Sequence, residues 1–261
     1  MTASREHGLD GWLSALRERH RSSLTSAEFL KALRALSARY VERRTTLPQQ
    51  SPLDSAGKRA AFAAFYAPLH FLTAREVVRA LPGLSSSADL VVDLGCGTGA
   101  ASAAVALEHT RWPDLAGVDL HPWAVTETRW TWQQLGLHGT VRRLNLVTAA
   151  QQLINSRRKK PTSHTTVILA WSVNELPVQD RQRLLPILLE LPARNANVLV
   201  IEPLARSAVP WWDEWAHAIV AARGRADEWR FDIALPPELA AIDEAAGFQR
   251  ETLGARTLCL T

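Results

Sequence analysis

The residues best suited to chemistry lie in one segment, 90–100, which reads LVVDLGCGTGA. Gly95, Gly97 and Gly99 occupy alternate positions between a short apolar run and a stretch rich in small residues. Glycine is required where the backbone turns tightly and a ligand approaches so closely that a Cβ would collide. The segment therefore predicts a strand, a ligand-binding turn that includes Cys96, and a helix.

Two types of ligand suit this turn. The spacing Gly95-x-Gly97-x-x-Ala100 fits the dinucleotide fingerprint, so an NAD-dependent oxidoreductase is one candidate. Asp93 argues for another, because a carboxylate would repel a pyrophosphate but could hold the ammonium of an amino-acid-bearing cofactor, directly or through water. The sheet also begins only after some 88 residues, whereas dinucleotide domains often start near their first strand. Both features favour S-adenosylmethionine.

A second acid, Asp119, closes the next predicted strand. A carboxylate at this place can accept hydrogen bonds from both ribose hydroxyls, although it could also cap a helix. Leu120 would then lie against the adenine. Asn145, just past the third predicted strand, could bind an adenine edge, although asparagine is common in any turn.

Five short apolar runs alternate with helix-like stretches after residue 88, which predicts a parallel sheet covered on both faces. The predicted strands are Asp89–Leu94, Leu115–Asp119, Thr140–Leu144, Thr165–Ala170 and Asn197–Ile201. The predicted helices are 99–109, 122–135, 147–156 and 178–191, and the tail adds a helix at 238–246 and strands at 249–253 and 256–260. Ligands bind beyond the carboxyl ends of parallel strands, so the loops that follow strands should face the chemistry.

These loops concentrate half of the ten tryptophans: Trp123, Trp171, Trp211, Trp212 and Trp215. Aromatic faces can line a slot for a flat substrate or attract a sulfonium by about 0.5–2 kcal/mol. Trp123 and Trp211 are candidate substrate contacts, but Trp211 belongs to a trio with helical spacing for which core packing is at least equally expected. Trp171 directly follows the fourth strand and is the stronger candidate, for both cofactor and catalysis.

The residues after Trp171 read SVNELP. Methyl transfer is an in-line displacement that needs an aligned nucleophile and removal of its proton. Glu175 could be the base and Asn174 could orient the acceptor, although Glu175 could equally cap the following helix. The Asn/Asp-Pro-Pro-aromatic loop of many base-amino methyltransferases is absent, which argues against exocyclic N-methylation of adenine.

The amino-acid composition limits the classes of protein to which this chain can belong. The 261 residues are 47% hydrophobic and 21% charged, which is typical of a soluble globular protein. No apolar stretch approaches the roughly 20 residues that cross a bilayer, so no membrane partner is expected. Two cysteines exclude a disulfide framework and a Cys-rich zinc site, and no metal is expected. Met1–Asp10 lacks an apolar secretory core, which predicts a cytoplasmic protein. The net charge of +4 allows a nucleic-acid partner without requiring one.

Residues 1–88 read as helices, chiefly Leu24–Val41 with Ser26 as N-cap and Lys58–Leu81, broken by the proline-containing run Thr45–Asp54. They carry 13 Lys or Arg against 7 Asp or Glu, which a solvated surface would also explain. The basic run Arg157–Lys160 precedes the fourth strand and should therefore lie at the edge of the sheet away from the transferred methyl group. We interpret it as a solvated loop or as a distal contact to phosphate. Two domains are expected: a helical extension, 1–88, and an α/β domain, 89–261.

The set Asp93, Gly95, Gly97, Gly99 and Asp119 resembles the class I S-adenosylmethionine-dependent methyltransferases. The resemblance covers residues 89–261. It implies a Rossmann-like α/β fold with a seven-stranded sheet whose last strand is antiparallel, here behind an all-helical N-terminal extension.

Short segments along nearly the whole chain are similar to the mitochondrial small-ribosomal-subunit methyltransferase-like family and its bacterial relatives. They are LSARY at 36–40, AFYAP at 64–68, NELP at 174–177 with Arg181, and IEP at 201–203. The family implies association with small-subunit rRNA or its assembly, with Tyr66, His70 and the arginine-rich helices over the cofactor and against RNA. Leu204 replaces a usual glycine, and the cysteines of the iron–sulfur members are missing, so no cluster is expected.

Three hypotheses follow. The first is methyl transfer from S-adenosylmethionine to RNA, with small-subunit rRNA or its assembly intermediate as the expected substrate. The second is methylation of a small or aromatic molecule in a tryptophan-lined pocket. The third is a cofactor-binding ribosome assembly factor without turnover, which the absence of a committed catalytic motif allows.

Overall fold

The structure is a computed structural model of the 261-residue chain. It describes residues 2–22, 24–42, 53–81, 83–84, 88–155 and 164–261, with the side chains of 2–7 and 39–42 left undescribed. The basic run Arg157–Lys160, most of the proline-containing break and Ser85–Ser87 lie outside these residues, as do the side chains of Arg39 and Tyr40.

The chain divides into two compact units. One comprises 1–70 with 230–253, and the other comprises 71–229 with 254–261. These units do not coincide with the division at residue 88 expected from composition, because residues near the carboxyl end contact the leading helices. Arg34, for example, donates to the backbone oxygens of Ala245 and Ala246.

The first unit is helical. Its elements are α1 (Thr2–Arg21), α2 (Ser26–Glu42), α3 (Ala56–Ala61), the π-helical turn η2 (Phe62–Tyr66), the start of α4 (Ala67–Ala80), and α10 (Pro237–Ala246). Thr25, not Ser26, caps α2: the Thr25 hydroxyl accepts from Glu28 N at 3.2 Å, and Glu28 Oε2 accepts from Thr25 N at 2.8 Å. This reciprocal capping box moves the predicted cap by one residue. The helix expected over 58–81 is interrupted by η2.

The second unit holds a sheet in the order β3-β2-β1-β4-β5-β7-β6. The strands are β1 (Leu90–Leu94), β2 (Asp114–Asp119), β3 (Gly139–Arg143), β4 (Thr165–Ala170), β5 (Ala196–Glu202), β6 (Arg225–Phe231) and β7 (Leu253–Leu260). The first five are parallel, and β7 is antiparallel to β5. The order turns back between β1 and β4, which is where an open sheet of this kind opens a crevice for ligand.

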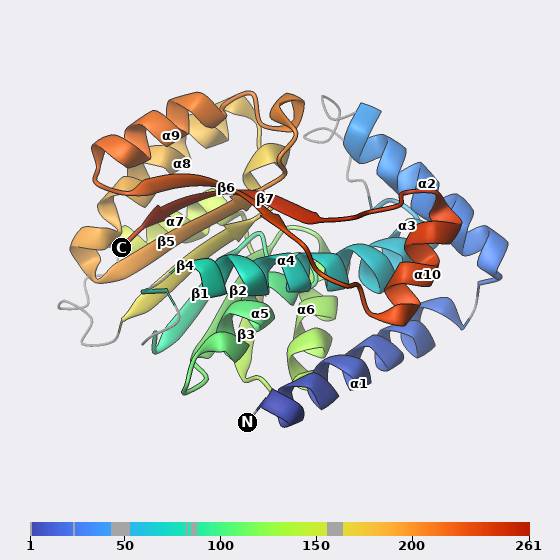
Figure 1. The fold of residues 1–261 in the computed structure, drawn as a ribbon. Helices are drawn as coiled ribbons and strands as arrows, with labels where there is room; N and C mark the ends of the chain where they lie inside the picture. Colours follow the sequence, from blue (N-terminus) through green and yellow to red (C-terminus); the bar gives the residue numbers. More distant parts are fainter. Residues whose placement is uncertain (1, 23, 43–52, 82, 85–87, 156–163) are drawn as a thin grey trace. The chain divides into compact units, whose positions relative to one another are not determined.

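Helices cover both faces of this sheet (Figure 1). They are α5 (Ala100–Glu108) and α6 (Pro122–Gln134) on one face, and α7 (Leu146–Asn155), α8 (Val178–Glu190) and α9 (Trp212–Ala221) on the other. The face under α7, α8 and α9 buries a continuous apolar cluster that includes Val92, Val167 and Val198 of the central strands. Every residue of β5 is buried, including the polar Asn197 and Glu202 on either side of its apolar run.

One prediction about the tail was wrong, and one strand was not predicted. Residues 249–253 do not form a separate strand; Gln249 has a positive φ of 49°, and β7 is one strand of eight residues. On the side away from β5, β7 neighbours β6, which was not predicted and whose sequence RADEWRF carries four charges. An edge strand can be this polar because one side of its backbone and much of its surface face solvent.

Candidate cofactor and active site

A tight turn of glycines follows β1. The N–H groups of Gly95 and Cys96 both donate to Val118 O of β2, at 2.9 and 3.0 Å. Gly95, Gly97 and Gly99 all have positive φ values, of 84°, 53° and 73°. A Cβ on Gly95 would lie 2.6 Å from Cβ of Ser172, whereas a Cβ on Gly97 would meet nothing within 4 Å. Gly95 is therefore required by packing, and Gly97 borders open space that a ligand can fill.

This difference gives a matched pair of variants. Gly95→Ala is expected to lower the free energy of unfolding by about 2–4 kcal/mol, because strain and a backbone-fixed clash combine. Gly97→Ala should cost about 1 kcal/mol from its φ alone, yet should weaken binding of a ligand in the turn. Urea unfolding and ligand calorimetry on both variants measure the two effects separately. Equal losses of stability would contradict the assignment of Gly97 to a ligand cradle.

Helix α6 fixes the far side of the turn. The Thr128 hydroxyl donates to Gly97 O at 2.8 Å, and Trp132 Nε1 donates to Gly99 O at 3.1 Å. A Cβ on Gly99 would lie 2.7 Å from each of these side chains. Sequence analysis missed both residues, although their i, i+4 spacing on one predicted helix face was a usable signal. Burial raises the pKa of the Cys96 thiol well above its ordinary value, so Cys96 is a neutral packing group.

Asp93 lies directly beneath this turn and is 1% exposed. Neither of its oxygens accepts a hydrogen bond of standard geometry from the described residues, although the hydroxyl and the backbone N–H of Ser102 are close enough to favour its charged form. Burial raises the pKa of Asp93 to about 7; Ser102 opposes this shift, and the nearby charge of Asp119 adds to it. A buried carboxyl without donors of standard geometry is costly unless a partner arrives, which is what a bound ammonium would provide.

Asp119 ends β2 and holds the turn from the other side. Its Oδ2 accepts from Gly97 N at 2.9 Å and its Oδ1 accepts from His121 N at 2.8 Å. Burial raises the pKa of Asp119, and these backbone donors act in the opposite direction. Asp119 does not cap α6, because His121 takes that place and accepts from Trp123 N. A carboxylate offers about four acceptor sites, so two remain for ribose hydroxyls.

The expected adenine contacts differ in character. Leu120 is 58% exposed, which is unusual for a leucine in a loop after a strand, and Arg143 Nε donates to its carbonyl at 3.0 Å. Asn145 caps α7: its Oδ1 accepts from the N–H groups of Val147 and Thr148. The amide NH₂ of Asn145 is therefore the group left to reach a ligand.

Trp171 has a strained backbone immediately after β4. Its φ is 54°, a region that bulky residues rarely adopt, and its N–H donates to Ile201 O at 2.7 Å. Such strain costs on the order of 1–3 kcal/mol and gathers at functional sites. This strain supports the prediction that Trp171 is a functional residue.

The loop after Trp171 is fixed at several points. The Ser172 hydroxyl donates to Leu94 O at 3.0 Å, and Arg181 Nη1 donates to Leu176 O. Glu202 Oε1 accepts from the N–H groups of Val173 and Asn174 at 2.9 and 3.1 Å. Ser172 and Glu202 were not predicted as site residues, because their bonds join segments 78 and about 28 residues apart.

Glu175 lies in this loop, in the short helical turn η3 (Val173–Glu175). It does not cap α8, since Pro177 is the N-cap residue and no side chain bonds the first turn. Burial raises the pKa of Glu175 to about 8, and the charge of Asp119 adds to this shift. A carboxyl that titrates near neutral pH is suited to accept a proton.

The four candidate substrate contacts have different local surroundings. Trp123 packs edge-on against His121 at the start of α6. Trp211 is 7% exposed and packs edge-to-face against Trp215 with ring centroids 4.7 Å apart, so it belongs to the core. Tyr66 and His70 belong to the first unit, where their rings contact Phe62. Burial lowers the pKa of His70 to about 3, so its imidazole is neutral.

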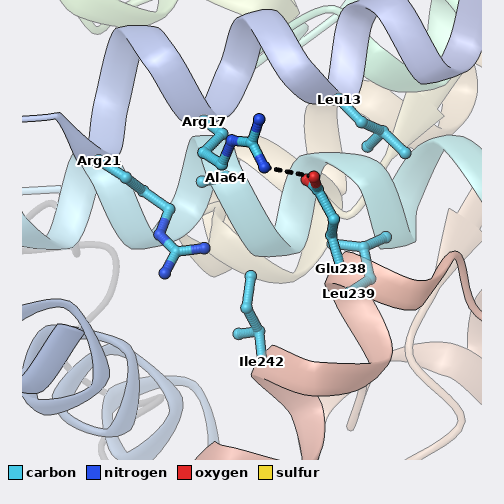
Figure 2. A pocket seen from close by; sticks show the side chains of 7 residues that line it. All are labelled: Leu13, Arg17, Arg21, Ala64, Glu238, Leu239 and Ile242. Atoms are coloured by element: carbon cyan, nitrogen blue, oxygen red, sulfur yellow. Dashed lines mark hydrogen bonds and ion pairs between the residues drawn. The ribbon is translucent and has the colours of Figure 1, made fainter.

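A small pocket in the first unit is a different kind of site (Figure 2). It is lined by Leu13, Arg17, Arg21, Ala64, Glu238, Leu239 and Ile242. Arg17 pairs with Glu238 at 2.5 Å, and the guanidinium of Arg21 lies 4.7 Å from the centroid of the Phe29 ring. The pocket offers two arginines and an apolar floor, and its one carboxylate, that of Glu238, is paired with Arg17.

Two kinds of feature are absent from the described residues. Among them, no helix combines the length and the apolar character needed to span a bilayer. The same residues include no cluster of three or more His, Cys, Asp or Glu side chains placed to hold a metal ion.

Comparison with known proteins bears on the fold. No protein-family model and no curated protein sequence matches the chain. An O-methyltransferase family protein from Burkholderia thailandensis superposes with a TM-score of 0.52 at 15% identity, over 94% of this chain and 75% of that chain. For an S-adenosylmethionine-dependent methyltransferase from Leishmania major the TM-score is 0.50 at 10% identity, over 95% and 91%. Against mitomycin 7-O-methyltransferase MmcR the TM-score is 0.49 at 14% identity, over 89% of this chain and 66% of that chain.

At these identities the likeness concerns the fold alone. The predicted architecture is confirmed: the chain has the Rossmann-like α/β fold of the class I S-adenosylmethionine-dependent methyltransferases.

Proposed function

We propose that this protein binds S-adenosylmethionine and transfers its methyl group to an acceptor. The observation that carries the proposal is Asp93, a buried carboxyl without a donor of standard geometry among the described residues, directly behind a glycine turn whose central residue borders open space. An ammonium satisfies such a group, whereas a pyrophosphate would be repelled by it.

The residues present fit this cofactor. Asp93 would hold the ammonium, the turn at Gly97 would admit the amino-acid part, and Asp119 would bind the ribose hydroxyls. Leu120, already exposed, would cover one face of the adenine. When bound, S-adenosylmethionine supplies a methyl group on a sulfonium, and the faces of aromatic side chains such as Trp171 attract that charge.

The chain's own part in the reaction is alignment and proton removal. The loop 172–176 is held by the bonds of Ser172, Glu202 and Arg181, so its side chains are preorganised. Glu175 would accept the proton that the acceptor loses, and Asn174 would orient the acceptor.

Calorimetry with S-adenosylmethionine and with NAD tests the cofactor. We expect heat of binding with the first only, and a loss of about 1.5–3 kcal/mol of binding free energy in Asp119→Ala. Asp114→Ala, at the opposite end of the same strand, is the matched control. Binding of NAD with equal affinity would contradict the proposal.

We propose further that the acceptor is RNA, with small-subunit rRNA as the first candidate. The ordered matches to the ribosomal methyltransferase-like family support this, as does the basic character of the leading helices. Arg21, which has no acidic partner among the described residues, and the solvent-exposed Arg17 could both contact phosphates. A small aromatic acceptor is the second candidate, favoured by the strained Trp171.

Binding of a small-subunit rRNA fragment at several salt concentrations separates these acceptors. RNA binding through phosphates should weaken steeply with salt, and Arg21→Ala should reduce the slope by about one counterion. Affinity for a neutral aromatic compound, unaffected by salt, would favour the second candidate. Salt-sensitive RNA binding with no methyl transfer to any rRNA would favour a non-catalytic assembly factor.

A further inference from the structure

Glu202, at the end of β5, is buried in an unusual way. Its side chain is 0% exposed. Oε1 accepts two hydrogen bonds, from the backbone N–H groups of Val173 and Asn174. Oε2 is equally buried and has no partner among the described residues. One oxygen of this carboxyl therefore has two hydrogen-bond donors, and the other has no hydrogen-bond partner among the described residues.

A second buried oxygen without a hydrogen-bond partner among the described residues belongs to Asn174, which Glu202 already contacts. Oδ1 of Asn174 is buried and accepts no hydrogen bond from the described residues, although the residue as a whole is only partly buried. Asn174 N is 3.1 Å from Glu202 Oε1. Since covalent geometry keeps Oε2 near Oε1 and Oδ1 near its own backbone nitrogen, the two unpartnered oxygens belong to neighbouring groups. Two buried acceptors on neighbouring groups can both be satisfied by one proton shared between them.

We propose that Glu202 acts as a neutral carboxylic acid that donates a hydrogen bond from Oε2 to Oδ1 of Asn174 and thereby orients this side chain for catalysis. Both buried oxygens are then satisfied by one proton. Because the bond selects the oxygen of the amide, it leaves the NH₂ of Asn174 as the end that can reach a ligand. Asn174 then presents donors to a methyl acceptor that carries a lone pair, such as a carbonyl or ring nitrogen; this last step rests on the proposed function.

The charged groups around Glu202 are consistent with a neutral acid. Burial raises the pKa of Glu202 well above its ordinary value; the two backbone donors and Arg181 oppose the shift, and Glu175 adds to it. The charge of Arg181 is not available to Glu202 alone. Its guanidinium donates to Leu176 O, and the charge of Glu214, like that of Glu202, acts to raise its pKa. Arg256, opposite Glu202 in the β5–β7 ladder, pairs with Glu228 at 2.7 Å and donates to Leu204 O.

Infrared spectroscopy of the whole protein tests the proton directly, without cofactor or acceptor. At neutral pH, we expect the spectrum of the wild type minus that of Glu202→Gln to contain a protonated-carboxyl band. Glu175→Gln, the matched control, should keep the band. A difference spectrum without this band would overturn the proposal.

Methyl transfer to small-subunit rRNA tests the consequence. Glutamine can accept with its oxygen and donate with its NH₂, so Glu202→Gln should transfer methyl at least about tenfold faster than Glu202→Leu. Equal rates in these two variants, with both folded by circular dichroism, would contradict the role of the acid. Asn174→Asp keeps an oxygen but loses the NH₂, so it should be as slow as Asn174→Ala; wild-type speed in Asn174→Asp would also contradict it.

The two proposals fail in different ways. If the wild type binds no S-adenosylmethionine or methylates no acceptor, the proposed function fails while the infrared band still reports on Glu202. If methyl transfer occurs and the band is missing, the function stands and the role of Glu202 as a neutral acid is refuted.

Discussion

Replacing Asp93 with asparagine is expected to make the stability of the ligand-free protein less dependent on pH while weakening S-adenosylmethionine binding about 10- to 100-fold. The reason lies in the burial of this carboxyl. In the unfolded chain it ionises near 3.8, whereas in the folded protein it keeps its proton until about pH 7. Between these values unfolding releases a proton, so the free energy of unfolding falls as pH rises.

The size of this effect follows from the same values. The slope is at most about 1.4 kcal/mol per pH unit, the whole loss is on the order of 2–4 kcal/mol, and it is complete above pH 7. Asparagine has nearly the same shape and does not ionise, so the wild-type and Asp93→Asn curves should diverge between about pH 4 and 7. Urea unfolding at a series of pH values measures the divergence. Asp114→Asn, which removes an exposed acid, is the control.

The ligand should reverse the order of stability. A bound ammonium converts the carboxyl of Asp93 from a destabilising group into half of an ion pair, so S-adenosylmethionine should stabilise the wild type more than Asp93→Asn, most clearly above pH 7. Parallel unfolding curves for the two proteins would show that Asp93 is not held protonated. Equal ligand affinities would show that it does not hold the ammonium.

The elements of the sheet could be predicted from sequence because their signals are local. Apolar runs mark β1, β2, β4 and β5 to within a residue or two, and glycines at alternate positions mark the turn after β1. Edge strand β6 escaped prediction because a strand with one solvated side carries no apolar run. The π-helical turn η2 also escaped, since its sequence FAAFY fits an ordinary helix.

The site was predicted only where residues act close to their own strand. Asp93, Gly97 and Asp119 are recognisable because each stands at the end of a strand or in a turn with a demanding backbone. Thr128, Trp132 and Glu202 act on backbone atoms of segments about 28–33 residues away. The i, i+4 spacing of Thr128 and Trp132 indicates only a shared helix face, and nothing in the sequence ties Glu202 to the loop after β4. Trp211 shows the converse, because an aromatic near the catalytic edge can serve packing alone.

Glu175→Gln is expected to slow methyl transfer by about 10²–10⁴-fold and to remove its dependence on pH. In the wild type, kcat/KM should rise with pH and level off above about 8, because the pKa of Glu175 is raised to about 8 and only the ionised form accepts a proton. Single-turnover transfer from radiolabelled S-adenosylmethionine across this range measures it. Glu190→Gln, which removes an exposed acid at the end of α8, should keep the wild-type profile.

Two further measurements test the role of Glu175 as the base, one of stability and one of kinetics. Since the folded carboxyl titrates at about 8 and the unfolded one at 4.5, the stability of the wild type falls as pH rises between these values, and Glu175→Gln should lose that fall together with its activity. A bound sulfonium and ammonium also favour the ionised carboxylate, so kcat, which reports the complex, should level off at a lower pH than kcat/KM. A fast Glu175→Gln enzyme with an unchanged pH profile would place the base elsewhere, and coincident kcat and kcat/KM profiles would place Glu175 away from the cofactor's charge.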